Sequence, residues 1–175
     1  MRYIALLRGI NVGGNNMIKM KKLRAAFESL GFENVKSYIN SGNLAFDTRK
    51  SSDSKLAAKI HNAIEKEFGF DISVMVRSVS EIEKLVEENP FEGQFENDKD
   101  LHLFFLDSEL TADQKSKLLE QGNDKEMLAV SGRHIYCLLK ISILDSFVGK
   151  GFIDKKLKIP ATARNWRTVG KLIEL

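Results

Sequence analysis

The residues best suited to bind a ligand lie in a glycine-rich loop that follows the first apolar segment. Arg8, Asn11, Gly13 and Gly14 come after the apolar run of residues 3–7 and precede a basic segment with helical periodicity. An arginine holds a phosphate or carboxylate through two parallel hydrogen bonds, and glycine lets backbone N–H groups approach an anion. A helix N-terminus beside such a loop adds the attraction of its dipole. The pattern therefore predicts a site for a small phosphate- or nucleotide-like anion.

A predicted β-hairpin places two more polar residues near this loop. Ser41 and Asn43 flank Gly42, which can adopt the positive φ that a tight turn needs. In a β-α-β-β-α-β unit the first and third strands are neighbours, so we expect the turn and the loop at one edge of the sheet. The alternative is that the asparagines satisfy turn backbone and the glycines relieve strain, with no ligand involved.

Arg164 and Asn165 form a second candidate for ligand binding. We expect them in the first turn of a C-terminal helix that Thr162 caps and that buries Trp166. A positive residue in that turn opposes the helix dipole, so Arg164 is expected to have an anionic partner, which is either a ligand or a carboxylate. The alternative for Asn165 is that it ties the terminal helix to the other subdomain.

Several established chemistries are not supported by the sequence. Gly9 and Gly14 have the spacing of a phosphate-binding P-loop, but Asn15 and Asn16 stand where its Lys and Ser/Thr belong. The three histidines are scattered, so no metal and no cofactor are predicted. His134 and Cys137 lie three apart on a predicted strand, and their side chains therefore point to opposite faces. The sequence assigns neither a reaction nor an oligomeric state.

The composition is that of a globular protein of 175 residues with one cysteine, Cys137, in an apolar run. A lone buried thiol fits a reducing compartment, and there is no signal-type segment and no apolar run long enough to span a membrane. We therefore expect a cytoplasmic protein that does not bind membranes.

Charge is distributed unevenly along the chain. Residues 1–77 carry 13 basic and 7 acidic side chains, residues 78–100 carry 2 and 8, and residues 101–175 carry 12 and 9. The basic halves make nucleic acid an alternative partner, although the third strand offers a single aromatic residue, Phe46, for stacking bases. A further alternative is a structural or regulatory module that binds another protein.

Hydrophobic periodicity predicts the elements of the first half. The spacing of Met20, Leu23, Phe27 and Leu30 predicts a helix that ends at Gly31. Strands are expected over residues 35–39, 44–46 and 72–76, with a helix over residues 53–68. A further helix, capped by Ser80, is expected to end before Pro90. The resulting order, β-α-β-β-α-β, is the ferredoxin-like pattern.

The second half repeats the first part of this order, β-α-β-β. A strand over residues 101–106 is followed by a helix capped by Thr111 and Gln114, and then by a second hairpin that turns at residues 131–132. Because both hairpins turn at Ser-Gly, we predict an internal duplication. The fold class is thus α+β: two ferredoxin-like (βαββα) subdomains in tandem, with mostly antiparallel sheets. The first covers residues 1–90 and the second, with the C-terminal helix, residues 101–175, joined by an acidic linker over residues 91–100.

Both ends of the chain resemble the family known as domain of unknown function 1697. The matching positions are residues 3–14, Met20, Leu23, residues 31–32, Val35, residues 41–43, Thr162, residues 164–166 and residues 168–169. The resemblance implies a cytosolic, bacterial-type α+β protein of unknown activity. Asn15 and Asn16 stand where basic residues are usual in the family, so the loop carries less positive charge than is usual. A second departure is Ala163, which replaces a second Thr.

Overall fold

The computed structural model describes residues 1–175 and divides the chain into two compact units. Unit 1 comprises Met1–Leu85 and Lys171–Leu175, and unit 2 comprises Val86–Gly170. The chain passes from unit 1 to unit 2 within helix α3 (Val79–Glu87) and returns within helix α6 (Trp166–Ile173). The division into domains 1–90 and 101–175 with a linker stays a prediction, and each unit is described by itself below.

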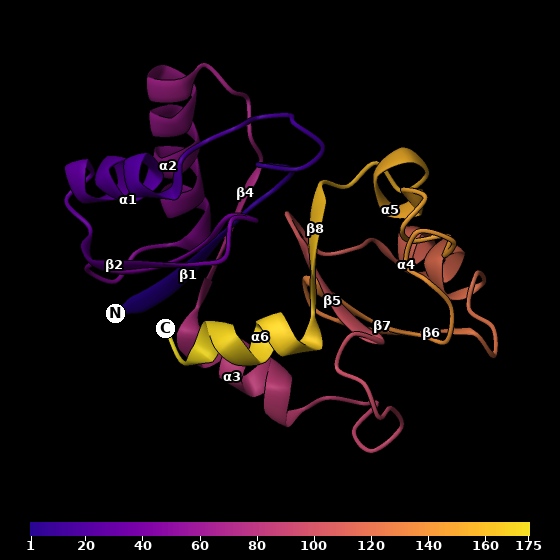
Figure 1. Ribbon diagram of the computed structural model, residues 1–175. Coiled ribbons are helices and arrows are strands. Elements are labelled where there is room, and N and C mark those ends of the chain that lie inside the picture. The colour runs from indigo at the N-terminus through magenta and orange to yellow at the C-terminus, as the bar shows by residue number, and fades with distance from the viewer. The chain divides into compact units, whose positions relative to one another are not determined.

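Unit 1 contains a four-stranded antiparallel sheet with helices on one face (Figure 1). Its elements are β1 (Arg2–Leu7), α1 (Met20–Ser29), β2 (Glu33–Tyr38), β3 (Asn43–Asp47), α2 (Asp53–Phe68), β4 (Val74–Ser78) and the start of α3. The strand order is β2-β3-β1-β4, which places β1 beside β3 as the sequence predicts.

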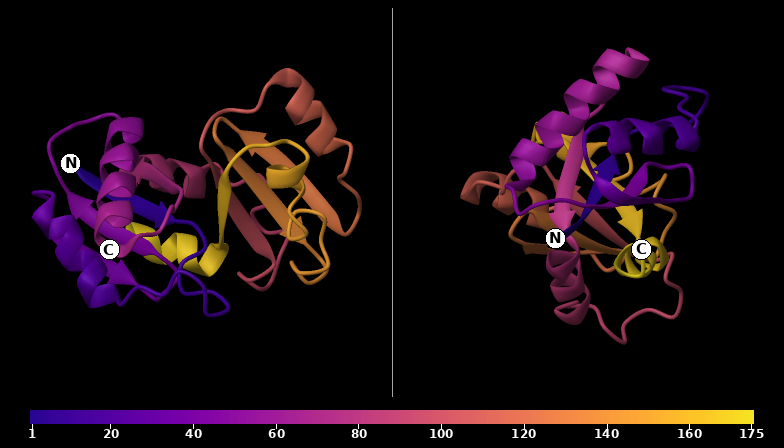
Figure 2. Two further views of the ribbon diagram at one scale, coloured as in Figure 1. Left: turned by 90° about the horizontal axis from the view of Figure 1, so that it is seen from above. Right: turned by 90° about the vertical axis from the view of Figure 1, so that its left-hand side faces the viewer.

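The core of unit 1 lies between this sheet and the helices α1 and α2 (Figures 1 and 2). Tyr3, Ala5 and Leu7 of β1 point into it, and Phe27 of α1 and Phe46 of β3 pack edge to face with ring centroids 5.6 Å apart. The alternate residues Ile4 and Leu6 are also fully buried, so β1 is apolar on both faces. This explains why its sequence is a continuous apolar run and does not alternate.

Unit 2 has the same order of elements and the same sheet order. Its elements are β5 (Leu101–Leu106), α4 (Ala112–Leu119), β6 (Glu126–Ser131), β7 (His134–Leu139), α5 (Phe152–Lys155), β8 (Ala161–Asn165) and the start of α6. The strands are all antiparallel in the order β6-β7-β5-β8. The structure thus confirms the α+β class with two similar halves, each built on an antiparallel sheet.

The sequence prediction was wrong about residues 161–165. They form strand β8, where Ala161 pairs with Leu106 and Ala163 with Phe104, so Thr162 does not cap a helix. The cap of α6 is Asn165, whose side-chain oxygen accepts a hydrogen bond from the Thr168 N–H at 2.9 Å. A similar correction applies to α3, where the Ser78 hydroxyl, and not that of Ser80, accepts from the Glu81 N–H at 3.2 Å.

The core of unit 2 contains the single cysteine. Cys137 is fully buried beside Phe104 and Leu139, and burial raises the pKa of its thiol well above the usual range. His134 lies outside this core cluster, and its ring packs edge to face against Phe105. The two side chains therefore point to opposite faces of the sheet, as predicted.

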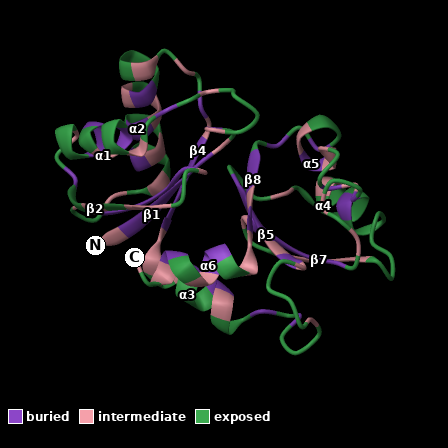
Figure 3. Cartoon of the chain, viewed as in Figure 1, coloured by how far each residue is buried: buried purple, intermediate pink, exposed green.

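Burial follows the layering of each unit (Figure 3). The central strands are buried along their length, whereas the helices are exposed on the side away from the sheet. No helix is both long and apolar enough to cross a membrane.

Candidate functional site

The predicted loop and hairpin meet at one edge of the unit 1 sheet. The Leu7 N–H donates to the Gly42 carbonyl at 2.8 Å, and a Cβ added to Gly42 would lie 2.7 Å from the Cβ of Leu7. Gly42 has φ +84°, a conformation that disfavours every residue with a side chain. The hairpin turn thus needs glycine for two reasons, its conformation and its close contact with the end of β1.

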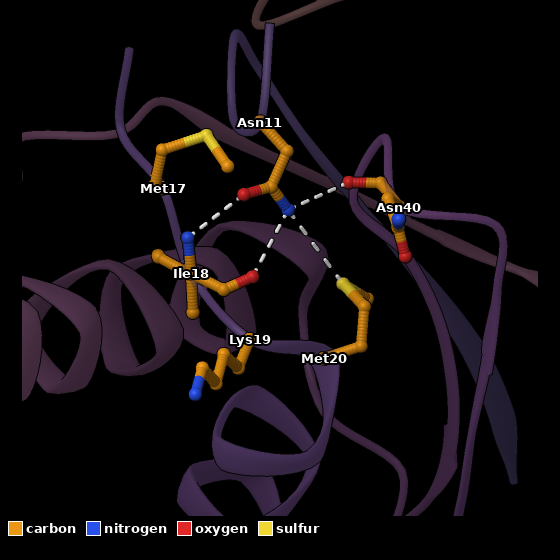
Figure 4. A pocket seen from close by; sticks show the side chains of 6 residues that line it. All are labelled: Asn11, Met17, Ile18, Lys19, Met20 and Asn40. Atoms are coloured by element: carbon orange, nitrogen blue, oxygen red, sulfur yellow. Dashed lines mark hydrogen bonds between the residues drawn. The ribbon is translucent and has the colours of Figure 1, made fainter. Parts of the chain in front are cut away.

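Asn11 is the residue that joins the two segments (Figure 4). Its Nδ2 donates to the carbonyls of Ile18 at 3.0 Å and of Asn40 at 2.9 Å, and its Oδ1 accepts from the Ile18 N–H at 2.8 Å. Its φ of +54° is one that asparagine tolerates better than most residues. Both amide hydrogens are used within the protein, so Asn11 positions the loop.

A pocket of about 400 Å³ opens beside Asn11 at the N-terminal end of α1 (Figure 4). Its other lining residues are Met17, Ile18, Lys19, Met20 and Asn40. These five residues were not predicted from the sequence to belong to the site. The sequence feature that could have indicated this pocket is Lys19. It stands just before the first helical residue, where a capping side chain is usual.

The α1 N-terminus carries no side-chain cap and no acidic residue in its first turn. The first N–H groups of a helix have no partners within the helix, and they form the positive end of its dipole. Lys19, Lys21 and Lys22 are exposed around this end. By contrast, Ser52 caps α2, and Thr111 and Gln114 form the predicted capping box of α4. The start of α1 is therefore a region of positive potential beside a pocket.

The remaining predicted residues of unit 1 lie outside the pocket lining. Arg8 is half-buried after β1, and its backbone N–H donates to the Ser73 carbonyl at 3.0 Å. Gly13 and Gly14 are exposed at the tip of the loop, with φ of +58° and +78°. Asn43 is fully buried, and its Nδ2 donates to the Ser41 hydroxyl at 3.0 Å. Ser41 and Asn43 thus contribute hydrogen bonds within the hairpin.

Arg164 and Asn165 lie on β8 in unit 2. The Arg164 Nη1 donates to the Thr162 hydroxyl and to the Ala163 carbonyl, both at 2.8 Å. Burial lowers the pKa of Arg164 to about 10, so the side chain remains charged at neutral pH. Because this residue is in a strand, the expected opposition to a helix dipole does not arise.

The single aromatic residue considered for stacking nucleic-acid bases is not accessible. Phe46 is fully buried in the unit 1 core, stacked on Phe32 with ring centroids 4.3 Å apart. Sheet-based recognition of single-stranded RNA needs exposed aromatic side chains. This face of the unit 1 sheet therefore lacks the surface that such recognition uses.

Comparison with known proteins assigns the chain to a family. A family model described as "Protein of unknown function (DUF1697)" matches residues 1–136. The solved structure of the conserved bacterial protein SP0830 from Streptococcus pneumoniae is similar, with a TM-score of 0.77, 29% sequence identity, and coverage of 99% of this chain and 97% of that one. No curated protein matches. Because the family model covers most of the sequence, the chain belongs to the DUF1697 family.

Proposed function

We propose that unit 1 binds a small phosphate- or nucleotide-like anion in the pocket at the start of α1, beside the loop of residues 8–14. The observation that carries this proposal is the pocket of about 400 Å³ next to a helix N-terminus that lacks both a side-chain cap and an acidic residue. Anions are stabilised at such ends by the unpaired N–H groups and the helix dipole.

The charge around the pocket favours the same class of ligand. Lys19 lines the pocket, and Lys21 and Lys22 follow it in the first turn of α1. No acidic side chain lines the pocket. The apolar side chains of Met17 and Met20 would contact the uncharged part of a ligand such as a nucleotide base.

The other predicted residues have supporting roles in this proposal. Asn11 holds the loop against residues 18 and 40 and thereby joins the segments that line the pocket. Gly13 and Gly14 leave backbone N–H groups exposed at the loop tip, and Arg8 adds positive charge to the same edge. Ligand binding by Arg164 remains a separate prediction.

A thermal-shift screen with phosphorylated metabolites and nucleotides tests the proposal. We expect at least one ligand to raise the melting temperature of the native protein. Its effect should be strongly reduced in Lys19→Gln, which removes a charge from the pocket, and more weakly in Arg8→Ala. Lys66→Gln is the matched control, because it removes an exposed lysine from the last turn of α2.

Two results would contradict the proposal. One is a screen in which no ligand stabilises the native protein. The other is stabilisation that Lys19→Gln and Arg8→Ala leave unchanged. Retention of RNA or DNA on a filter, with a binding constant whose logarithm falls linearly with the logarithm of the salt concentration, would instead support the nucleic-acid alternative.

A further inference from the structure

Unit 2 has a pocket of its own, of about 460 Å³, at the end of its sheet where β5 begins and where β7 and β8 end. Polar and apolar side chains both line it. The polar ones that matter here are Lys99, Asp100, His102, Lys140 and Asn165, and Ile141 and Ile143 contribute apolar surface. None of the residues that line the unit 1 pocket takes part, so this pocket is independent of the proposed function.

The sheet brings an imidazole and an amide together in this pocket. His102 of β5 pairs directly with Asn165 of β8. Side chains of directly opposed residues in an antiparallel pair point to the same face, with Cβ atoms roughly 4.5–5.5 Å apart. The backbone around them is fixed as well, because the Leu139 N–H donates to the Asp100 carbonyl at 2.8 Å. The two groups are therefore held side by side before any ligand binds.

The His102 ring has a polar atom that the protein does not satisfy. Its Nδ1 is buried and has no hydrogen-bond partner. Such atoms are rare in folded proteins, and each one calls for an explanation. Burial lowers the pKa of His102, and the backbone and the carboxylate of Asp100 offset only part of this effect. The ring is therefore mainly neutral at pH 7. Once the ring turns about χ2, a group in the pocket would become the partner of this nitrogen.

The neighbouring side chains offer further donors. Asn165 uses its Oδ1 to cap α6, which leaves its Nδ2 hydrogens without an acceptor in the protein. Lys99 and Lys140 are exposed at the pocket and form no ion pair. With Asp100 counted, the charged groups of the lining give a net charge of +1. This balance suits a monoanion better than a dianionic phosphate.

We propose that this pocket binds a small organic monocarboxylate. Its carboxylate would accept hydrogen bonds from the His102 imidazole and the Asn165 amide, with Lys99 and Lys140 supplying long-range attraction. Its apolar body would lie against Ile141 and Ile143. Because Nδ1 is closed off from solvent, a hydrogen bond from the ligand to this atom requires the ring to turn about χ2. The NMR signals of the ring nitrogens should therefore change when the ligand binds.

Titration of the full-length protein, labelled with 15N in its histidines, tests this proposal. Butyrate is the probe, acetate lacks the apolar body, and inorganic phosphate lacks both the apolar body and the carboxylate. We expect butyrate to shift the His102 ring signals saturably with a Kd on the order of 1 mM, and acetate and phosphate to bind at least about fivefold more weakly. The His61 and His134 signals should not move and serve as internal references.

Two variants distinguish specific binding in this pocket from a general effect of added salt on the NMR signals. His102→Phe keeps a ring of similar size without the unsatisfied nitrogen, so it should fold normally, and its backbone amides at residues 139–143 should no longer respond to butyrate. The double variant K99Q/K140Q should weaken binding several-fold. Absence of a His102 shift, equal responses to butyrate and phosphate, or an unchanged response in His102→Phe would overturn the proposal.

Discussion

The two units share one topology, but the two pockets for which we propose ligands lie at opposite ends of equivalent sheets. In unit 1 the pocket follows the end of β1, whereas in unit 2 it adjoins the start of β5. In each unit an irregular connection supplies part of the wall: residues 17–19 before α1, and residues 140–143 after β7. The strand order is therefore the same in both units, whereas the positions of these two pockets depend on the irregular connections that line them.

The last strands of the two units are closely similar in detail. Arg77 of β4 and Arg164 of β8 are both buried, and each donates from Nη1 to the carbonyl of the preceding residue at 2.8 Å. In both units the next residue caps the following helix, Ser78 for α3 and Asn165 for α6. This repeated arrangement supports the predicted duplication, which a comparison with related sequences would test.

The second helices are where the units differ most. Helix α2 has 16 residues and α5 has 4. The core that α2 fills in unit 1 is filled in unit 2 by Ile153 of α5 and by side chains of the irregular segments around it, among them Val148, Leu157 and Ile159. Such a segment needs specific hydrogen bonds and close contacts, since it has no helix ladder to hold it.

The largest expected effect is at Gly149, inside that irregular segment. A Cβ at this position would overlap the backbone carbonyl of Ile143, which cannot move away as a side chain can. We expect Gly149→Ala to lower the free energy of unfolding by about 4 kcal/mol or more. Urea unfolding followed by circular dichroism measures this. Gly170→Ala is the control: its Cβ would meet nothing within 4 Å, so it should be neutral or stabilising.

The corresponding test in unit 1 is at the hairpin turn. Gly42→Ala combines a left-handed backbone with overlap onto Leu7, whereas Gly14→Ala has a similar φ of +78° and no neighbour within 4 Å of its Cβ. We expect Gly14→Ala to cost roughly 1 kcal/mol and Gly42→Ala roughly 2–3 kcal/mol. Equal losses of unfolding free energy would show that the contact between hairpin and loop contributes nothing.

The sequence predicted the elements whose signals are local. The bounds of α2, the capping box of Thr111 and Gln114, and the Gly42 turn each depend on residues within a few positions of one another. Strand β8 was missed because Thr162 is its only residue with a strong strand preference, and its conformation comes from pairing with β5, far away in the sequence. Thr162 before a helical pattern then looked like a cap.

The candidate site was predicted only in part, because some of its features depend on contacts between residues far apart in the sequence. Asn11 and the meeting of loop and hairpin follow from strand order. The pocket was not predicted, because it depends on hydrogen bonds from Asn11 to residues 18 and 40 that only the folded chain brings together. His102 was considered only as a metal ligand, and its unsatisfied nitrogen is a property of burial that no spacing reveals.

Helix capping gives the next largest contrast between the units. Thr111→Ala should remove the capping box of α4 and cost about 1 kcal/mol, whereas Lys19→Ser should provide α1 with the cap it lacks and stabilise the protein by roughly 0.5–1 kcal/mol. Chemical denaturation of both variants measures these changes. If Lys19→Ser weakens stabilisation by the anions found in the screen more than Lys19→Gln does, the cap and the ligand compete for the same N–H groups. Destabilisation by Lys19→Ser would mean that the start of α1 is already satisfied.

The smallest expected effect is the pH dependence contributed by His102. Because burial lowers its pKa in the folded protein, the unfolded chain binds more protons just below the ordinary value of about 6.5. Stability should therefore be fully present above that pH and should fall as the pH decreases toward the folded pKa, with a slope below the limit of about 1.4 kcal/mol per pH unit for one proton. Urea titrations between pH 5 and 8, in buffers free of carboxylates, should show this slope in the native protein and a flatter curve in His102→Phe. Identical curves would mean that the imidazole is as well solvated in unit 2 as in the unfolded chain.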